Sequence, residues 1–409
     1  MYNLVFFIIV AIVVTDFILE RILHYLNRKS MHNELPEELS DVYDAEQYRK
    51  QQEYKKSNDR FGTLTSSVSL VLILLMLFLG GFRLVDSWAG ELTGNPILLV
   101  IIFFAILGIA SDLISTPFSL YDIFVIEEKF GFNRMTPKTF ITDKIKGWIL
   151  AAIIGGGLLA LIVWFYYQTG TMFWLYAWIL ATVFTVFMAM FYSSLIVPLF
   201  NKQKPLDEGM LREAIESFSK KAGFKLKNVY VIDGSKRSTK SNAYFTGLGP
   251  KKRIVLYDTL IKDLSVDEIV AVLAHEIGHY KKKHIYTGLI AGIIQTGLTL
   301  FILSLLIAKP SLSEALGSTE PNFHLGLIAF GILYSPISLV TGLLMNFISR
   351  KNEYAADRFV KEMDNPEALI SALKKLSSKN LSNLTPHPAY VFFHYSHPTV
   401  LQRIRALRK

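Results

Sequence analysis

The sequence predicts an all-α polytopic membrane protein with a mainly helical extramembrane part that carries a small β-hairpin. Of its 409 residues, 51% are hydrophobic and only 19% are charged, whereas soluble globular chains are nearer a quarter charged. Seven apolar runs approach or exceed the roughly 20 residues that a helix needs to cross a bilayer. The runs lie near residues 2–19, 63–82, 96–119, 147–167, 172–198, 285–308 and 324–348. A wholly soluble or disordered chain is therefore excluded.

The first run is expected to remain as a membrane span. It opens on Met1-Tyr2-Asn3 without basic residues, no small-residue cleavage site follows, and further spans come after it. These features argue against a cleaved signal peptide.

The distribution of lysine and arginine predicts the orientation of the protein in the membrane. The connections after spans one, three and five and the C-terminal tail are rich in Lys and Arg, and the other connections are nearly devoid of them. By the positive-inside rule, the N-terminus lies outside, and the large insertion and the C-terminus lie in the cytoplasm. The net charge of +9 therefore indicates topology and a lipid bilayer as partner, with no nucleic acid. A bacterial inner membrane and an ER membrane both fit.

The same pattern divides the chain into four parts. We expect spans one to five with a polar arm (20–62), an insertion, spans six and seven, and a C-terminal helical part that completes a metal site. These parts cover residues 1–200, 201–283, 284–349 and 350–409. Within the insertion, Asn228 to Asp233 predicts a short strand. Asn242 to Thr246 and Arg253 to Tyr257, around Gly247, Gly249 and Pro250, predict a hairpin.

A metal-binding motif follows the hairpin. The chain has no cysteine, so histidines and carboxylates must supply any metal ligands. Ser265 to Glu268 predicts a capped helix start, and the helix continues into His275-Glu276-Ile277-Gly278-His279. His275 and His279 lie one turn apart on one face and can bind a single zinc ion, while Glu276 can take a proton from the attacking water. His284 is expected off the ligand face, as an ordinary interfacial histidine.

A catalytic zinc needs a third protein ligand. Glu353 and Asp357 follow the last span and share one helix face. One of them can bind the metal while the other orients a ligand histidine. By spacing alone, a charged helix whose acids pair with Arg350 and Arg358 is an equal alternative.

Several long motifs now resemble the type I CAAX prenyl protease family, whose members are seven-span zinc metalloendopeptidases. The resemblance covers nearly the whole chain and fits a bacterial member as well. The motifs are Phe124 to Asn133, Val197 to Lys202, Ser235 to Ser238, Ser241 to Gly247, His275 to His279, and Ser349 to Asp357.

The resemblance implies seven tilted helices around a water-filled intramembrane chamber, with a gluzincin-type protease domain. It implies one Zn²⁺ per chain, Glu353 as third ligand and Asp357 as its second-shell partner. It also singles out His397 and Arg403 as catalytic residues that help polarise the scissile carbonyl. The implied reaction removes the last three residues of prenylated CAAX proteins or peptides.

Other interpretations stay open at this point. The strand Asn242-Ala243-Tyr244-Phe245 could bind an extended substrate backbone through its edge, or it could be a structural hairpin. The protein could be a quality-control protease for unprenylated membrane proteins, or a non-catalytic chamber-forming membrane protein with a vestigial metal site.

Overall fold

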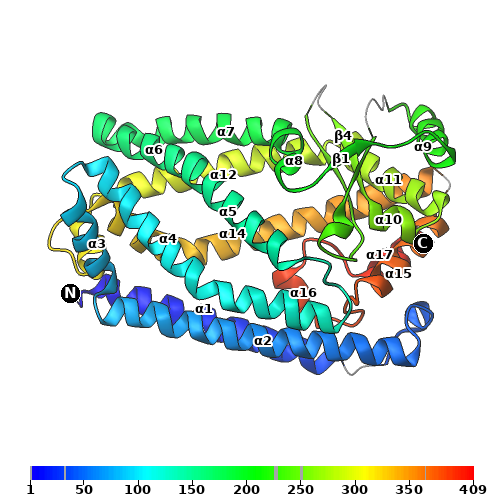
Figure 1. The fold of residues 1–409 in the computed structure, drawn as a ribbon, viewed down its shortest axis with the longest axis horizontal. Helices are drawn as coiled ribbons and strands as arrows, with labels where there is room; N and C mark the ends of the chain where they lie inside the picture. Colours follow the sequence, from blue (N-terminus) through cyan, green and yellow to red (C-terminus); the bar gives the residue numbers. More distant parts are fainter. Residues whose placement is uncertain (1, 32–33, 225–228, 249–251, 364) are drawn as a thin grey trace.

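The computed structural model describes residues 2–31, 34–224, 229–248, 252–363 and 365–409. Long helices run side by side along the long axis of the molecule (Figure 1). A small sheet and the short C-terminal helices gather at one end of these helices (Figure 1). The residues of the predicted metal site all come from this end.

Long helices form the elongated part. They are α1 (Leu4–Ser30), α2 (Ala45–Phe78), α4 (Pro96–Tyr121), α7 (Phe173–Leu195), α12 (His284–Leu306) and α14 (Phe323–Glu362), together with α6 (Gly156–Thr169), which continues α5 (Pro137–Leu150) through a π-helical turn. Polar N-cap residues stabilise the first turns of several of these helices. The Asn3 side chain accepts a hydrogen bond from the Phe6 backbone amide at the start of α1, and Asn95 caps α4 directly before Pro96.

Among the described residues, five helical segments are long and apolar enough to cross a membrane. They are Ala45–Phe78, Pro96–Glu127, Pro137–Phe200, His284–Leu306 and Phe323–Glu362. Few of the side chains in their apolar stretches are buried inside the protein, as expected for helices that face lipid. The chain is therefore a multi-pass membrane protein.

The predicted count of seven spans is not confirmed. The run 2–19 lies in α1, which is not among the five segments, and the runs 147–167 and 172–198 both fall within Pro137–Phe200.

Shorter helices connect the long ones. They are α3 (Gly81–Leu92), α5 (Pro137–Leu150), α8 (Val197–Phe200), α9 (Met210–Lys221), α10 (Asp258–Asp263) and α13 (Pro310–Ala315). Single 3₁₀ turns occur at Glu37–Leu39, Gly170–Met172 and Gly234–Lys236, and π-helical turns at Asp122–Glu127 and Ala151–Gly155.

The predicted hairpin is part of a larger sheet. β3 (Ala243–Thr246) pairs antiparallel with β4 (Arg253–Tyr257), which confirms the hairpin strands, although Gly249 and Pro250 lie outside the described residues. β2 (Val229–Ile232) confirms the predicted strand without Asn228, which is also outside them, and pairs parallel with β4. β1 (Gln203–Pro205) adds to β2, so the order is β1-β2-β4-β3. The sequence predicted neither β1 nor the pairing of β2 with β1 and β4, because these pairings are non-local.

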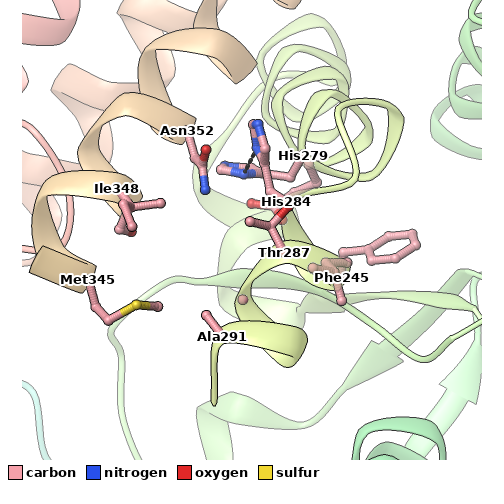
Figure 2. Close-up of a pocket in the computed structure, with 12 residues that line it drawn as sticks. Phe245, His279, His284, Thr287, Ala291, Met345, Ile348 and Asn352 are labelled. Atoms are coloured by element: carbon pink, nitrogen blue, oxygen red, sulfur yellow. Dashed lines mark hydrogen bonds between the residues drawn. The ribbon is translucent and has the colours of Figure 1, made fainter. Parts of the chain in front are cut away.

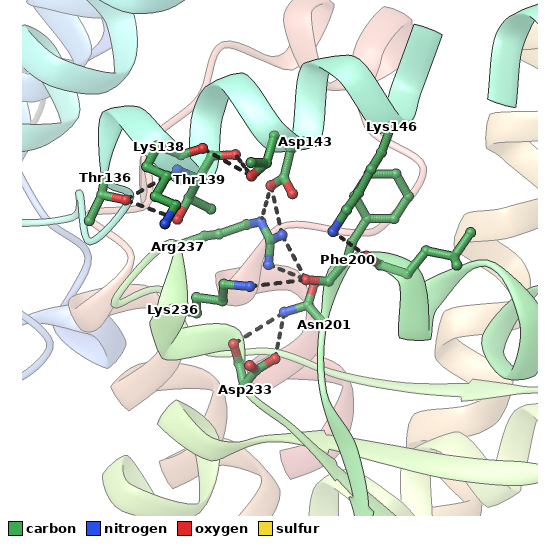
Figure 3. A network of polar contacts seen from close by, with 12 residues as sticks. Thr136, Lys138, Thr139, Asp143, Lys146, Phe200, Asn201, Asp233, Lys236 and Arg237 are labelled. Atoms are coloured by element: carbon green, nitrogen blue, oxygen red, sulfur yellow. Dashed lines mark hydrogen bonds and ion pairs between the residues drawn. The ribbon is translucent and has the colours of Figure 1, made fainter. Parts of the chain in front are cut away.

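Arg237 ties this sheet to the membrane helices (Figure 3). Its Nε donates to Asp143 of α5 at 2.8 Å, its Nη1 donates to Asn201 Oδ1 at 2.9 Å, and its Nη2 donates to the Phe200 carbonyl at 2.8 Å. Asn201 Nδ2 in turn donates to Asp233 Oδ1 at 2.9 Å. Charge-assisted bonds of this kind fix orientation well. The network therefore holds the sheet against the middle of α5 and the end of α8.

The central helix of this end is α11 (Val266–Lys281), which carries the zinc motif. Its start is the predicted capping box, formed by Ser265 and Glu268. Apolar residues on opposite sides of α11, among them Ala271, Leu273 and Ala274, are buried in two clusters. These clusters join α11 to the sheet and to two C-terminal helices, α15 (Pro366–Lys379) and α17 (Val400–Arg408). The third C-terminal helix, α16 (Pro388–His394), packs against α1 and α14 instead.

The cap makes stability depend on pH. Burial alone would raise the pKa of Glu268, but hydrogen bonds from Lys375, Ser371 and the Ser265 backbone amide outweigh it and hold that pKa below its ordinary value. A lowered folded-state pKa means that the unfolded chain binds more protons in acid. The stabilisation is therefore complete above the unfolded pKa of about 4.3 and is lost as pH falls through the folded value.

We expect Glu268→Gln to destabilise the protein by about 1 kcal/mol at pH 7, the usual cost of a lost cap, and by less near pH 4. Thermal unfolding in detergent at both pH values measures this. Asp267→Asn is the matched control, because Asp267 is exposed in the same first turn. Equal losses for both variants at both pH values would contradict the prediction.

Candidate metal centre

Two histidine side chains of α11 lie close together. His275 Nε2 and His279 Nε2 lie 3.1 Å apart, as expected for side chains one helical turn apart. His275 is buried and His279 is partly buried. Two imidazole nitrogen atoms therefore face each other at one point above the helix.

α14 brings a carboxylate to the same point. Glu353 Oε2 lies 3.3 Å from His275 Nε2, and Glu353 Oε1 lies 3.1 Å from His279 Nε2. A Cβ on Gly278 would lie only 3.2 Å from the Ala356 backbone, so this glycine allows α11 and α14 to approach closely. The glycine inside the motif thus helps to bring the third side chain within reach of the two histidines.

These three side chains fit a metal ion. Their ligand atoms all lie within 4.8 Å of one another, and they form the one such group found among the described residues. Glu353 Oε2 is buried and makes no hydrogen bond within the described part of the chain. A buried carboxylate oxygen that accepts no hydrogen bond costs free energy, and His275 and Arg403 approach this one only at 3.3 and 3.7 Å. A cation between the three side chains would remove that cost.

Asp357 and Arg403 lie behind His275. Asp357 Oδ1 is 2.9 Å from His275 Nδ1, so the Nδ1–H can donate to the carboxylate and leave Nε2 free for a metal. Arg403 donates to both Asp357 oxygens, from Nε at 2.9 Å and from Nη2 at 2.6 Å. Burial would lower the pKa of Arg403, but the Asp357 carboxylate outweighs burial and keeps that pKa above its ordinary value. The guanidinium therefore stays charged and orients Asp357.

His284 makes a contact that the sequence did not predict (Figure 2). Its Nδ1 lies 3.0 Å from Nδ1 of His279. This contact was not expected, although His284 is not part of the three-residue ligand group. α11 ends at Lys281, Lys283 between the two helices has a φ of 60°, and His284 begins α12. No local sequence pattern marks this break, because Lys283 is not a glycine.

We expect His284 to position His279 for metal binding. If His279 binds metal through Nε2, its Nδ1–H can donate to His284 Nδ1, as outer partners of metal ligands do. His284→Leu should weaken metal affinity about 10- to 100-fold, whereas His284→Gln, which keeps an acceptor, should restore part of it. Metal content after dialysis against graded chelator measures this. Equal metal retention by both variants and the parent would exclude the role.

A cavity lies next to the ligand group (Figure 2). It has a volume of about 310 Å³, and its lining includes Phe245 of β3, Glu276 and His279 of α11, and Asn352 of α14. Glu276 is only partly buried and faces this space from the helix that carries both histidines. Of the predicted substrate strand, Phe245 reaches the cavity, and β3 is an edge strand of the sheet. The Glu276 carboxylate, one of the three potential metal ligands (His279) and one residue of the edge strand (Phe245) thus line one cavity.

His397 approaches the group from the loop before α17. Its Nε2 lies 3.3 Å from Glu353 Oε1, and its side chain is 62% exposed. All of the predicted site residues on α11, α14 and the C-terminal part are thus brought together. Their chemical roles, including those of His397 and Arg403 toward a scissile carbonyl, stay predictions.

Comparison with known proteins identifies the family. Residues 24–202 match the family described as CAAX prenyl protease N-terminal, five membrane helices, and residues 205–409 match peptidase family M48. The chain belongs to the M48 peptidases. CAAX prenyl protease 1 of Saccharomyces cerevisiae is 35% identical to this M48 peptidase over 93% of the chain and 90% of the relative. The Homo sapiens homolog is 33% identical over 91% of the chain and 88% of the relative.

A solved structure confirms the architecture of this M48 peptidase. Ste24p of S. mikatae superposes with a TM-score of 0.94 at 35% identity, and the match covers 99% of each chain. The resemblance predicted from the motifs is therefore confirmed. The protein is a membrane metalloprotease that acts on peptide or protein substrates, and the family implies a metal at a site such as the His275, His279 and Glu353 group.

Proposed function

We propose that this M48 peptidase is a zinc endopeptidase that removes the last three residues of prenylated CAAX proteins. The observation that carries the proposal is the convergence of His275, His279 and Glu353 beside a cavity that also holds Glu276. The names of the relatives, which are CAAX prenyl proteases, support the substrate class.

Zinc is the metal that this donor set favours. Two imidazole nitrogens and one carboxylate form a common catalytic zinc set, in which the fourth position remains open for water or substrate. The convergence of only three ligand groups among the described residues agrees with an open position. When bound, zinc would act as a Lewis acid toward the attacking water and the scissile carbonyl.

Glu276 is proposed as the general base and acid. It follows the ligand His275 directly and lines the cavity beside His279. Its carboxylate takes a proton from the attacking water as the new C–O bond forms. It then passes that proton to the leaving amine nitrogen as the C–N bond breaks.

We propose that His397 and Arg403 both support the reaction, His397 from an exposed position at the site and Arg403 from a buried one. His397 is exposed at the group and can donate to the developing oxyanion of the substrate. Arg403 is buried and donates to Asp357, so its proposed contribution to polarising the carbonyl reaches the substrate through Asp357 and His275. This makes Arg403 a positioning residue in the proposal.

The free edge of β3 is proposed to bind the substrate backbone. The Tyr257 amide donates to the Asn242 carbonyl at 3.1 Å, so the alternation of an antiparallel pair turns the backbone groups of Ala243 and Phe245 to the other edge. The Ala243 amide donates to Asn242 Oδ1 at 2.8 Å. A substrate carbonyl would replace this side-chain oxygen as the acceptor. An extended peptide can therefore add to β3.

We expect Ala243→Pro to raise KM for a peptide substrate about fivefold to tenfold, because it removes one backbone donor at the free edge. Edge positions tolerate proline, so metal content and thermal stability should stay unchanged. Steady-state kinetics of peptide cleavage measures KM. An unchanged KM with a lowered kcat would remove β3 from the binding surface.

Seven spans remain our proposal for the membrane part. Pro137–Phe200 contains two apolar helices, α6 and α7, joined by a turn at Gly170 with a φ of 54°, and α1 begins with an apolar stretch. The positive-inside pattern supports an outside N-terminus and a cytoplasmic metal site. The position of the sheet and α11 between α8 and α12 supports the boundaries at residues 200 and 283, whereas α14 continues across residue 349.

Mass spectrometry of a farnesylated CAAX peptide tests the function directly. Detergent-purified protein should release a product shortened by three residues, and the chelator phenanthroline should abolish it. An unprenylated peptide of the same sequence is the matched substrate control. If zinc-loaded protein leaves the farnesylated peptide intact but cleaves unprenylated fragments, the CAAX proposal fails.

A further inference from the structure

A second cavity lies beside the C-terminal helices. It has a volume of about 650 Å³ and lies between α14, the loop before α16, and α17. Its lining shares no residue with the cavity at the metal centre. It is therefore a separate feature of the molecule.

One wall of this cavity is apolar and continues into the lipid-facing surface. Phe347 of α14 and Phe392 of α16 are each 51% exposed and line it. Leu384 and Val391, both buried, also line it. Phe347 belongs to the apolar run that ends at residue 348. The cavity thus opens where a membrane helix leaves the hydrocarbon region, and an acyl chain can lie along this wall.

The lining also contains basic residues. Arg350, Lys351 and Arg405 line the cavity, and its lining contains no acidic residue. Arg405 Nε donates to Glu38 at 2.8 Å, and Arg350 Nη1 donates to the Tyr395 carbonyl at 2.6 Å. Lys351 contacts the face of the Phe347 ring at 5.2 Å, and no described carboxylate lies within ion-pair distance of it. Glu38 neutralises one of the three cations, so positive charge remains in excess.

We propose that this cavity binds an anionic phospholipid. The headgroup phosphate contacts Lys351 and Arg405, and the acyl chains lie over Phe347 and Phe392. A basic pocket at the end of a membrane helix is a recognised site for anionic headgroups, and the charge-assisted bonds that Arg and Lys make to phosphate are strong. The apolar wall selects a lipid over a soluble phosphate.

Native mass spectrometry of the delipidated full-length protein in neutral detergent tests this proposal. Phosphatidylglycerol, phosphatidylcholine and soluble glycerol phosphate are added separately at equal concentrations. We expect phosphatidylglycerol to bind in preference to the other two. Lys351→Gln should weaken its binding about fivefold, as expected for one basic side chain near an anionic lipid, and adding Arg405→Gln should weaken it further.

Lys361→Gln is the matched control, because Lys361 is an exposed lysine on the same helix outside the cavity. Its lipid binding should equal that of the parent. Equal binding of phosphatidylcholine, or equal effects of the two lysine variants, would overturn the proposal. Glycerol phosphate binding as tightly as phosphatidylglycerol would reduce the site to an anion site. Displacement of the lipid by a farnesylated peptide would assign the cavity to substrate instead. Thermal unfolding of each variant shows that it is folded.

Discussion

Glu276→Gln is expected to lower kcat about 10²- to 10⁴-fold, the range that general acid–base catalysis contributes. The amide keeps the size of the side chain but cannot accept the proton of the attacking water. Glu276 lines the cavity beside the three ligand groups and is not one of them. The bound metal and the fold should therefore be unaffected, and KM should change little.

Single-turnover cleavage of the peptide, together with metal analysis of the same preparation, measures this loss. Asp267→Asn is a suitable control for a carboxylate removed from the same helix at its exposed start. A Glu276→Gln protein that retains its metal and the parent rate would remove Glu276 from the mechanism. A protein that loses its metal would instead show that Glu276 supports the ligands.

The local part of the site could be predicted from the sequence because helix geometry alone determines it. His275 and His279 are one turn apart, and their Nε2 atoms do meet at 3.1 Å. Glu353 and Asp357 share a face, and both reach His275. Spacing could not decide which acid binds the metal. Glu353 is the one that lies close to both histidines, because α14 crosses α11 at Gly278.

The non-local parts could not be predicted. The parallel pairing of β2 with β4 joins strands far apart in the chain, which no local pattern encodes. The contact of His284 with His279 was missed because one left-handed residue, Lys283, separates the two helices. The buried contact of Arg403 with Asp357 depends on how α17 packs on α14. Each of these features depends on tertiary packing, which the hydrophobic periodicity of the sequence does not reveal.

Glu353→Gln is expected to abolish both metal binding and proteolysis. Its carboxylate is the single charged ligand in the group, and it lies within 3.3 Å of both histidine nitrogens. Loss of an outer partner costs about 10- to 100-fold in metal affinity, and loss of a charged ligand should cost more than that. Asp357→Asn should therefore retain measurable metal where Glu353→Gln retains none.

Metal binding also provides a readout that does not depend on activity. A ligand that binds only the folded state stabilises it in proportion to RT ln(1 + [L]/Kd). Added zinc should therefore raise the unfolding temperature of the metal-free parent, raise it less for Asp357→Asn, and leave Glu353→Gln unchanged. Glu362→Gln, an exposed position at the end of the same helix, should behave as the parent does. If zinc stabilises Glu353→Gln as strongly as the parent, Glu353 is not a ligand, and the two histidines must find their third partner elsewhere.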